Sequence, residues 1–112
     1  MRVTVAVATV LAALLEEPDS DRYGLDLMAA TGLPSGTMYP ILRRLQDAGW
    51  VTADWERIDP VVTGRPARRY YRLTPDGVQR ARAALAELRA ATTPGRSTKD
   101  AASGRRRARP AW

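Results

Sequence analysis

The sequence predicts a mainly α-helical fold with one small β-hairpin. Apolar residues first recur with the period of a helix and then alternate with period two directly after Gly49. The helical pattern returns after Thr74, where Thr-Pro-Asp-Gly forms a strong helix start. A chain of 112 residues is expected to form a single domain.

The composition narrows the classes of function that the chain can have. It contains no His and no Cys, so the usual general base, the commonest metal ligand and all thiolate chemistry are absent. It also has no Gly-rich phosphate loop and no pair of carboxylates in an apolar frame. We therefore expect no enzyme, no catalytic residue, no cofactor and no metal ligand, although a metal site built only from carboxylates stays open.

The positive charge is concentrated at the C-terminal end. The formal net charge is +6, yet residues 1–91 carry 12 Arg against 11 acidic residues. Residues 92–112 carry five Arg and one Lys against one Asp, and they lack apolar periodicity. We therefore predict a folded domain over residues 1–91 and a disordered basic tail over 92–112. Any nucleic-acid argument for the domain must rest on where its arginines cluster.

The first predicted helix, Val3 to Leu15, is uncharged and apolar on nearly every side, but it is too short to span a membrane. A signal peptide is the alternative interpretation. The apolar run, however, leads into Glu16 and Pro18 without a convincing cleavage site, so we expect a cytoplasmic protein. Because a domain this small rarely buries such a helix alone, we expect a partner subunit to cover part of it.

A second helix is predicted from Tyr23 to Thr31, with Leu25, Met28 and Ala29 facing inward, and it ends in a turn over Gly32–Pro34. The third helix starts near Gly36 or Thr37. Ser35 or Thr37 can cap it, and Pro40 is expected in its first turn.

Gly49 is expected to end the third helix. Its inward stripe comprises Met38, Ile41, Leu42, Leu45 and Ala48, and its outer side comprises Gly36, Tyr39, Arg43, Gln46 and Asp47. Two short helices joined by a Gly-containing turn, the second amphipathic, form the helix-turn-helix pattern. The outer side of the third helix therefore either lies in a DNA major groove or is an ordinary solvated surface.

The alternating segments predict a hairpin of two strands, Trp50–Arg57 and Arg68–Thr74. Val51, Ala53 and Trp55 share one face of the first strand, Tyr71 and Leu73 share the inner face of the second, and Asp54 and Glu56 are expected on a solvated face. The connection carries Gly64-Arg65-Pro66 near its tip. A hairpin that directly follows a recognition helix is a wing, and its arginines would meet a DNA backbone or minor groove. The alternative is a solvated hairpin.

The last predicted helix runs over residues 75–91, with Thr74 as its N-cap. Apolar residues at spacings of three and four suggest a dimer seam, although the same residues could belong to the core. We expect this seam to be shared with the first helix, and the predicted interface comprises Val7, Leu11, Val78, Ala81, Leu85 and Leu88. The predicted architecture is therefore a winged helix-turn-helix plus a C-terminal dimerisation helix.

Three ordered blocks of the sequence resemble the PadR family of transcriptional regulators. They are YGLDLM at 23–28, SGTMYPILRRLQDAGWVTADWE at 35–56 and GRPARRYYRLTPDG at 64–77. The resemblance covers roughly residues 5–91, and the single helix after the wing matches the short subclass of the family. It implies a dimeric DNA-binding protein, usually a repressor that a small-molecule ligand releases from its operator.

The resemblance also identifies residues for DNA contact. Thr37, Tyr39 and Arg43 are the expected contacts of the recognition helix, and Arg65 and Arg68 those of the wing. Together with neighbouring polar residues, the predicted DNA-binding set comprises Ser35, Thr37, Tyr39, Arg43, Arg44, Arg65, Arg68 and Arg69.

The chain departs from its resembled family in one respect. Multidrug-sensing short members stack flat ligands on a Trp of the last helix, whereas residues 75–91 contain no aromatic side chain. We expect Trp50 and Trp55 to pack in the core and the hairpin instead. The leading hypothesis is a homodimeric repressor on an inverted-repeat operator in duplex DNA. The alternative is a winged-helix protein-interaction module without operator binding, which acidic residues on the outer helix face would favour.

Overall fold

The computed structural model describes residues 1–92 and 94, so the predicted basic tail lies almost entirely outside the described residues. The elements follow the order α1 (Val5–Leu15), β1 (Arg22–Tyr23), α2 (Gly24–Thr31), α3 (Ser35–Asp47), β2 (Val51–Trp55), α4 (Pro60–Thr63), β3 (Arg69–Leu73) and α5 (Pro75–Thr92). The described chain is mainly helical with one small antiparallel sheet, ordered β1-β3-β2, which confirms the predicted fold class.

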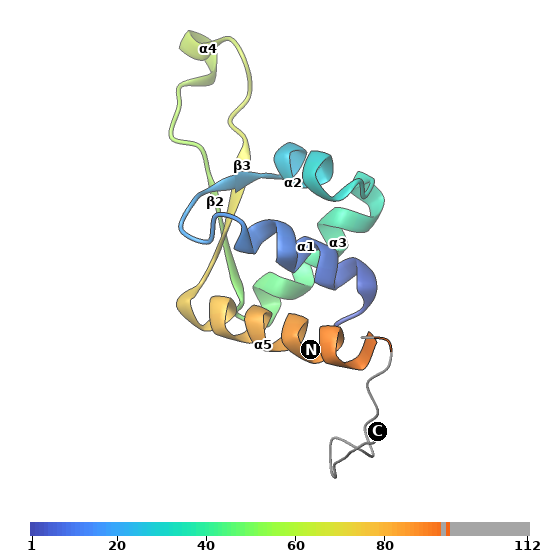
Figure 1. Ribbon diagram of the computed structural model, residues 1–112. Helices are drawn as coiled ribbons and strands as arrows, with labels where there is room; N and C mark the ends of the chain where they lie inside the picture. The colour runs from blue at the N-terminus through green and yellow to red at the C-terminus, as the bar shows by residue number, and fades with distance from the viewer. Residues whose placement is uncertain (93, 95–112) are drawn as a thin grey trace, which may run out of the picture.

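Helix α1 lies between α2 and α5 and forms the centre of the core (Figure 1). Six of its eleven residues are buried, namely Val7, Ala8, Val10, Leu11, Ala13 and Leu14. The chain itself therefore covers most of this helix, and only a narrow side with Val5 and Ala12 remains exposed. Thr4 caps its start by accepting a hydrogen bond of 3.2 Å from the Val7 amide. Within the described residues, no helix is long and apolar enough to cross a membrane.

Helix α2 buries different residues from those that the sequence suggested. Leu27 is fully buried, whereas Leu25 is 63% exposed and Ala29 also faces solvent. A helix of two turns presents one stripe of residues three and four apart to the core, and here that stripe begins at Gly24 and includes Leu27. The expectation that Leu25 and Ala29 point inward was therefore wrong, while Met28 is half-buried against the core.

Helix α3 begins one residue before its expected start. Ser35 is its first helical residue and Pro34 holds the N-cap position, so the expected side-chain cap from Ser35 or Thr37 is not formed. Pro40 lies in the second turn instead of the first, where its ring removes one helical hydrogen bond.

The inward stripe and the end of α3 largely follow the prediction. Four of the five predicted inward residues are buried: Met38, Ile41, Leu42 and Leu45. The fifth, Ala48, is the exposed C-cap, because the chain turns away there before Gly49. Gly49 has a φ of 80°, a conformation that favours glycine, and it ends the helix as predicted.

Strands β2 and β3 pair antiparallel, with Val51 opposite Leu73 and Trp55 opposite Arg69. These strands and the connection between them, residues 51–73, are called the wing, and they project away from the helices (Figure 1). The opposite edge of β3 pairs with β1, which the sequence did not predict because two residues carry no periodicity.

The far end of the wing is apolar. It holds the one-turn helix α4, whose start is capped by the Asp59 carboxylate at 3.0 Å from the Val61 amide. Val61 is 89% exposed and Val62 is 83% exposed. Gly64, at φ 80°, ends this turn, so Arg65 lies on the return toward β3 and not at the tip itself.

Helix α5 is fixed to the turn that precedes the wing. The Thr74 hydroxyl accepts a hydrogen bond of 2.8 Å from the Gly77 amide and donates one of 2.8 Å to the Gly49 carbonyl, which confirms the predicted N-cap. Gly77 is buried, and a β-carbon at this position would overlap the main-chain carbonyl of Trp50. Only glycine therefore permits this close approach of α5.

Candidate nucleic-acid interface

The outward side of α3 presents polar residues at a spacing of four. Ser35, Tyr39 and Arg43 share this side and are exposed. The Arg43 Nε lies 3.4 Å from an oxygen of Asp47, but the two side chains are 77% and 68% exposed. An ion pair so exposed contributes little stability, so Arg43 is able to exchange Asp47 for a phosphate.

Thr37 and Arg44 lie on one flank of this side, seven residues apart and therefore two turns from each other. Thr37 is half-buried and Arg44 is exposed. Asp47 is the single acidic residue of α3, so the helix does not present the acidic face that would favour a protein-interaction module.

Tyr39 lies across the start of α2. Gly24 is buried there, and a β-carbon on it would overlap the hydroxyl and ring of Tyr39. The absence of a side chain at position 24 therefore lets the Tyr39 ring pack against the α2 backbone. Tyr39 nevertheless remains 42% exposed, on the side of α3 that faces the wing.

A hollow of about 210 Å³ separates α3 from the base of the wing, and we call it the wing-base hollow. Its lining residues come from α2, α3 and β3, and from the residues beside them: Tyr23, Gly24, Leu25, Tyr39, Arg68 and Arg69. The hollow thus brings Tyr39 together with Arg68 and Arg69, which follow it by about thirty residues in the sequence. All three belong to the predicted DNA-binding set.

The two arginines of the wing-base hollow rest on aromatic rings. The Arg68 guanidinium lies 5.8 Å from the centroid of the Tyr23 ring, and that of Arg69 lies 5.1 Å from the centroid of the Trp55 ring. Among residues 1–92, neither guanidinium forms an ion pair with a carboxylate. Stacking orders a guanidinium without neutralising it, so both charges remain available to an anion such as a phosphate.

Arg65 has a different environment from Arg68 and Arg69. Its two terminal nitrogens donate to the two carboxylate oxygens of Glu56, at 2.6 and 3.0 Å. The Glu56 side chain is only 12% exposed, so the expectation of a solvated strand face was wrong for this residue. Glu56 also accepts hydrogen bonds from the Tyr23 hydroxyl at 2.8 Å and from the Arg68 amide at 3.0 Å.

These contacts shift the ionisation of the residues involved. The hydrogen bonds from Arg65 and Tyr23 lower the pKa of Glu56 to about 2, against the opposing effect of burial. The same carboxylate raises the pKa of Arg65 and that of the Tyr23 hydroxyl, which donates to it. Glu56 is therefore ionised at neutral pH, and its charge is matched by that of Arg65.

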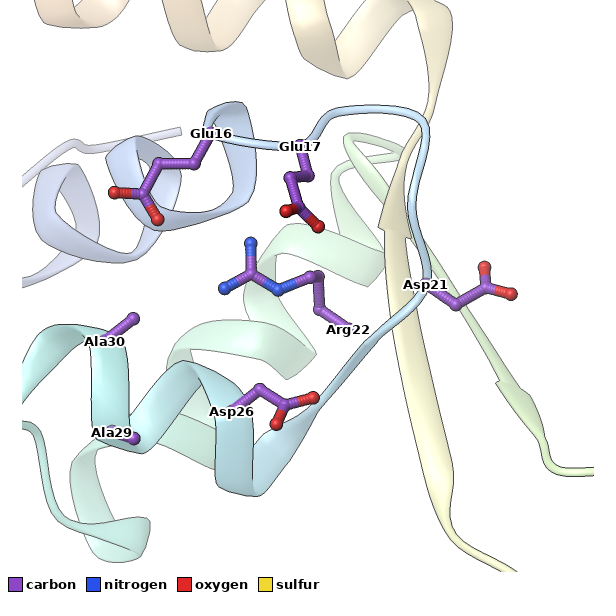
Figure 2. Close-up of a pocket in the computed structure, with 7 residues that line it drawn as sticks. All are labelled: Glu16, Glu17, Asp21, Arg22, Asp26, Ala29 and Ala30. Carbon is purple, nitrogen blue, oxygen red and sulfur yellow. The ribbon is translucent and has the colours of Figure 1, made fainter.

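A second hollow, of about 540 Å³, lies at the C-terminal end of α1 and is acidic (Figure 2). Arg22 points into it between Glu17 and Asp26, and its Nη1 donates to the carbonyl of Ala13 at 2.8 Å. This contact satisfies one of the last carbonyls of α1. Carboxylates outnumber Arg22 here, so this surface would repel DNA.

The described residues contain no group of three or more acidic, His or Cys side chains placed to hold a metal ion. The outer side of α3 carries exposed arginines, and the wing-base hollow is lined by Arg68 and Arg69 without a carboxylate, so these two surfaces together suit a nucleic acid.

The residues predicted for a dimer interface fall into two groups. Val7, Leu11 and Ala81 are at most 1% exposed and belong to the chain's own core, so they have no free surface for a partner. Val78, Leu85 and Leu88 are half-buried on α5. Leu88 also lines a groove between α5 and the N-terminal residues Met1 and Val3.

Comparison with solved structures shows which proteins share this fold. A PadR family transcription regulator from Clostridium difficile is 22% identical, with a TM-score of 0.62, over 77% of this chain and 88% of that one. The smu.1704 protein of Streptococcus mutans is 24% identical, with a TM-score of 0.64, over 97% of this chain and 98% of that one.

A third similar structure is BpsR of Bordetella bronchiseptica, whose DNA binding is regulated by 6-hydroxynicotinic acid. It is 20% identical, with a TM-score of 0.61, over 90% of this chain and 69% of that one. At these identities the likeness concerns the fold. None of the curated proteins matches the sequence.

The family is established by the sequence match itself. The model of the transcriptional regulator PadR-like family matches residues 10–83, which is more than half of the chain and includes α2, α3 and the whole wing. Proteins of this family are transcriptional regulators and not enzymes, as the composition had suggested. The chain therefore belongs to the PadR-like family of DNA-binding transcriptional regulators.

Proposed function

We propose that this protein is a homodimeric repressor that acts in the cytoplasm, binds an inverted-repeat operator and is released by a small-molecule effector. One observation carries the DNA-binding part of the proposal. The wing-base hollow places Tyr39 of α3 beside Arg68 and Arg69, two guanidinium groups without carboxylate partners in the described part of the chain.

The proposed division of labour follows from reach and charge. Helix α3 enters the major groove, where Ser35 and Thr37 in its N-terminal half and Arg43 in its C-terminal half could reach base edges or phosphates. Arg44 extends this contact on the flank of the helix. Arg68 and Arg69 hold the backbone beside the groove, and each neutralised phosphate makes the affinity more dependent on salt.

The proposed dimer uses the part of the predicted interface that remains accessible. Val78, Leu85 and Leu88 form the half-buried side of α5, and the α1 residues support it from the core. Two copies related by a two-fold axis present two equivalent recognition helices. Their target should therefore be an inverted repeat, with half-sites about one helical turn or a multiple apart.

The effector is proposed by analogy with BpsR, whose DNA binding is regulated by 6-hydroxynicotinic acid. Helix α5 has no aromatic residue on which a flat ligand could stack. We therefore expect polar and aliphatic side chains to bind the effector, without aromatic stacking on α5.

The alternative function is a winged-helix module for protein interaction, without operator binding. The exposed Val61 and Val62 at the end of the wing favour it, because apolar side chains at a tip suit a protein surface. The single acid on α3, Asp47, argues against it.

The deciding experiment is a selection from a pool of randomised DNA duplexes with the full-length protein, followed by a footprint on the enriched sequence. The DNA just upstream of the protein's own coding region serves as a second probe. Two symmetric protected half-sites are expected. Failure to enrich any sequence would favour the interaction module, and protection of one asymmetric site by a monomer would refute the dimeric repressor.

A further inference from the structure

We propose that Glu56 is a positioning residue that locks the wing onto the helix-turn-helix, and that Arg65 serves this lock instead of binding DNA. The inference rests on the proposed DNA-binding function. It concerns four residues, Tyr23, Glu56, Arg65 and Arg68, which we call the wing latch.

The wing latch joins three separate segments of the chain through one carboxylate. Glu56 follows β2, Tyr23 immediately precedes α2, and Arg65 and Arg68 lie on the chain between α4 and β3. One oxygen of Glu56 accepts from the Arg65 Nη1 and the Arg68 amide, and the other accepts from the Arg65 Nη2 and the Tyr23 hydroxyl. Each oxygen of the carboxylate accepts two hydrogen bonds, so the hydrogen-bonding capacity of Glu56 is filled.

The contact with Arg65 has the features of a strong pair. It is bidentate, and the exposed fractions of the two side chains are 33% and 12%. Such planar pairing fixes geometry better than a single exposed ion pair does. By contrast, the Arg43–Asp47 pair on α3 is open to solvent and has one long contact. The Arg65 guanidinium is therefore committed to Glu56, whereas that of Arg43 is not.

The same carboxylate determines where Arg68 lies. Glu56 holds the Arg68 amide, and Tyr23, which donates to Glu56, carries the ring on which the Arg68 guanidinium rests. The Tyr23 ring also meets Tyr70 edge to face, with centroids 6.3 Å apart. Loss of the Glu56 carboxylate would thus remove the side-chain contacts to the Arg68 amide and to Tyr23 together, leaving only the main-chain hydrogen bond of 2.8 Å from the Glu56 amide to the Arg68 carbonyl. Loss of Arg65 would remove the bidentate pair that holds the carboxylate in this position. The wing latch therefore acts on DNA through the placement of Arg68 in the wing-base hollow.

Salt dependence separates this role from direct phosphate binding. A residue that neutralises a phosphate contributes about one unit to the slope of log affinity against log salt, whereas a positioning residue contributes none of its own. The experiment titrates full-length variants at several salt concentrations on two duplexes. One duplex is enriched by the wild type from a randomised pool, and the other is unrelated and of equal length.

We expect Arg68→Ala to weaken binding to both duplexes and to flatten the slope by about one unit. We expect Arg65→Ala to weaken binding to both duplexes about tenfold with the slope of the wild type retained, because Arg68 still reaches its phosphate in the complex but is no longer held in place before binding. Glu56→Gln should lower affinity in the same way as Arg65→Ala, and the two changes together should cost no more than the larger of the two single losses, because both break the Glu56–Arg65 pair. Arg65→Lys should restore part of the loss.

Several outcomes would overturn the wing latch. One is a slope flattened by Arg65→Ala as much as by Arg68→Ala, which would make Arg65 a phosphate ligand. Another is tighter binding of both duplexes by Glu56→Gln, which would mean that the carboxylate merely masks a DNA-binding arginine. Additive losses in the double variant would contradict the shared contact.

Circular dichroism and thermal unfolding establish that each variant is folded. Should Arg65→Ala fail to fold, Tyr23→Phe decides, because it removes one hydrogen bond to Glu56 and keeps the ring under Arg68. Weaker binding at an unchanged slope supports the wing latch, and binding equal to the wild type contradicts it. If the wild type does not distinguish the two duplexes, the proposed function fails. If the wild type distinguishes the two duplexes but Arg65→Ala flattens the salt slope, only the wing latch fails.

Discussion

The helical part of the molecule and the wing are each stabilised by a different kind of interaction. The helices share an apolar core in which α1 supplies six buried residues and α3 supplies four. The wing beyond its paired strands has no buried residue, and the Glu56 carboxylate fixes its base through polar contacts. Apolar packing contributes mainly to stability, whereas a network of charged hydrogen bonds fixes the orientation of the groups that it joins. Changes in the helices should therefore alter folding, and changes in the wing should alter DNA binding.

The largest expected effect is in the helical part. Gly77→Ala would force a methyl group into the Trp50 carbonyl and disrupt the hydrogen bond of 2.9 Å between that carbonyl and the Thr74 amide. We expect a loss of about 3 kcal/mol or more of unfolding free energy, which corresponds to a fall of about 12 °C or more in Tm.

The matched control for this variant is Gly36→Ala, also in a helix. A β-carbon at Gly36 would meet no atom within 4 Å, so this change should be neutral or stabilise by up to about 1 kcal/mol. Calorimetry of both variants checks the pair. Equal Tm values for the two variants would show that α5 does not approach the Trp50 carbonyl as closely as described.

A second prediction concerns the face of the helical part that remains available to a partner. Leu85→Asp places a charge on the half-buried side of α5, and it should convert a homodimer to a monomer at micromolar concentration. Ala83→Asp, on the exposed side of the same helix, should leave the mass unchanged. Sedimentation equilibrium measures both. A Leu85→Asp protein with the wild-type mass would place the interface elsewhere.

A smaller effect is expected from the pH dependence of the wing. The pKa of Glu56 is lowered from 4.5 to about 2 in the folded chain, so the unfolded chain binds its proton first as the pH falls. The stability that Glu56 contributes is therefore fully present above pH 4.5 and is lost as the pH falls toward about 2. Urea unfolding should show a difference in unfolding free energy between the wild type and Glu56→Gln, and this difference should disappear as the pH falls over this range. A difference that does not depend on pH would contradict the ionic nature of the contact.

The elements with long, periodic patterns could be predicted from the sequence. The stripe of α3, the Gly49 stop and the Thr74 cap depend on residues close together in the chain, so local spacing was enough to identify them. Alternation likewise identified Val51 and Leu73 as buried, but Trp55 on the same predicted face is 55% exposed.

Features that depend on distant residues could not be predicted in this way. Strand β1 has two residues and exists because β3 offers it an edge. Glu56 looked like part of a solvated strand, because its partner Tyr23 lies 33 residues away and Arg65 was interpreted as a tip residue. The inward assignment of Leu25 failed because a shift of one residue turns a helix by about 100°, which changes the side that meets the core.

The central claim is that α3 reads the bases while the wing base holds the backbone. The most direct test is a titration of Thr37→Ala and Arg68→Ala on the enriched and the unrelated duplex at several salt concentrations. Thr37→Ala should cost about 1–3 kcal/mol on the enriched duplex and little on the other, and Arg68→Ala should weaken both and flatten the salt slope by about one unit. If Thr37→Ala leaves the ratio of the two affinities intact, α3 is not the element that reads the sequence, and the account is wrong.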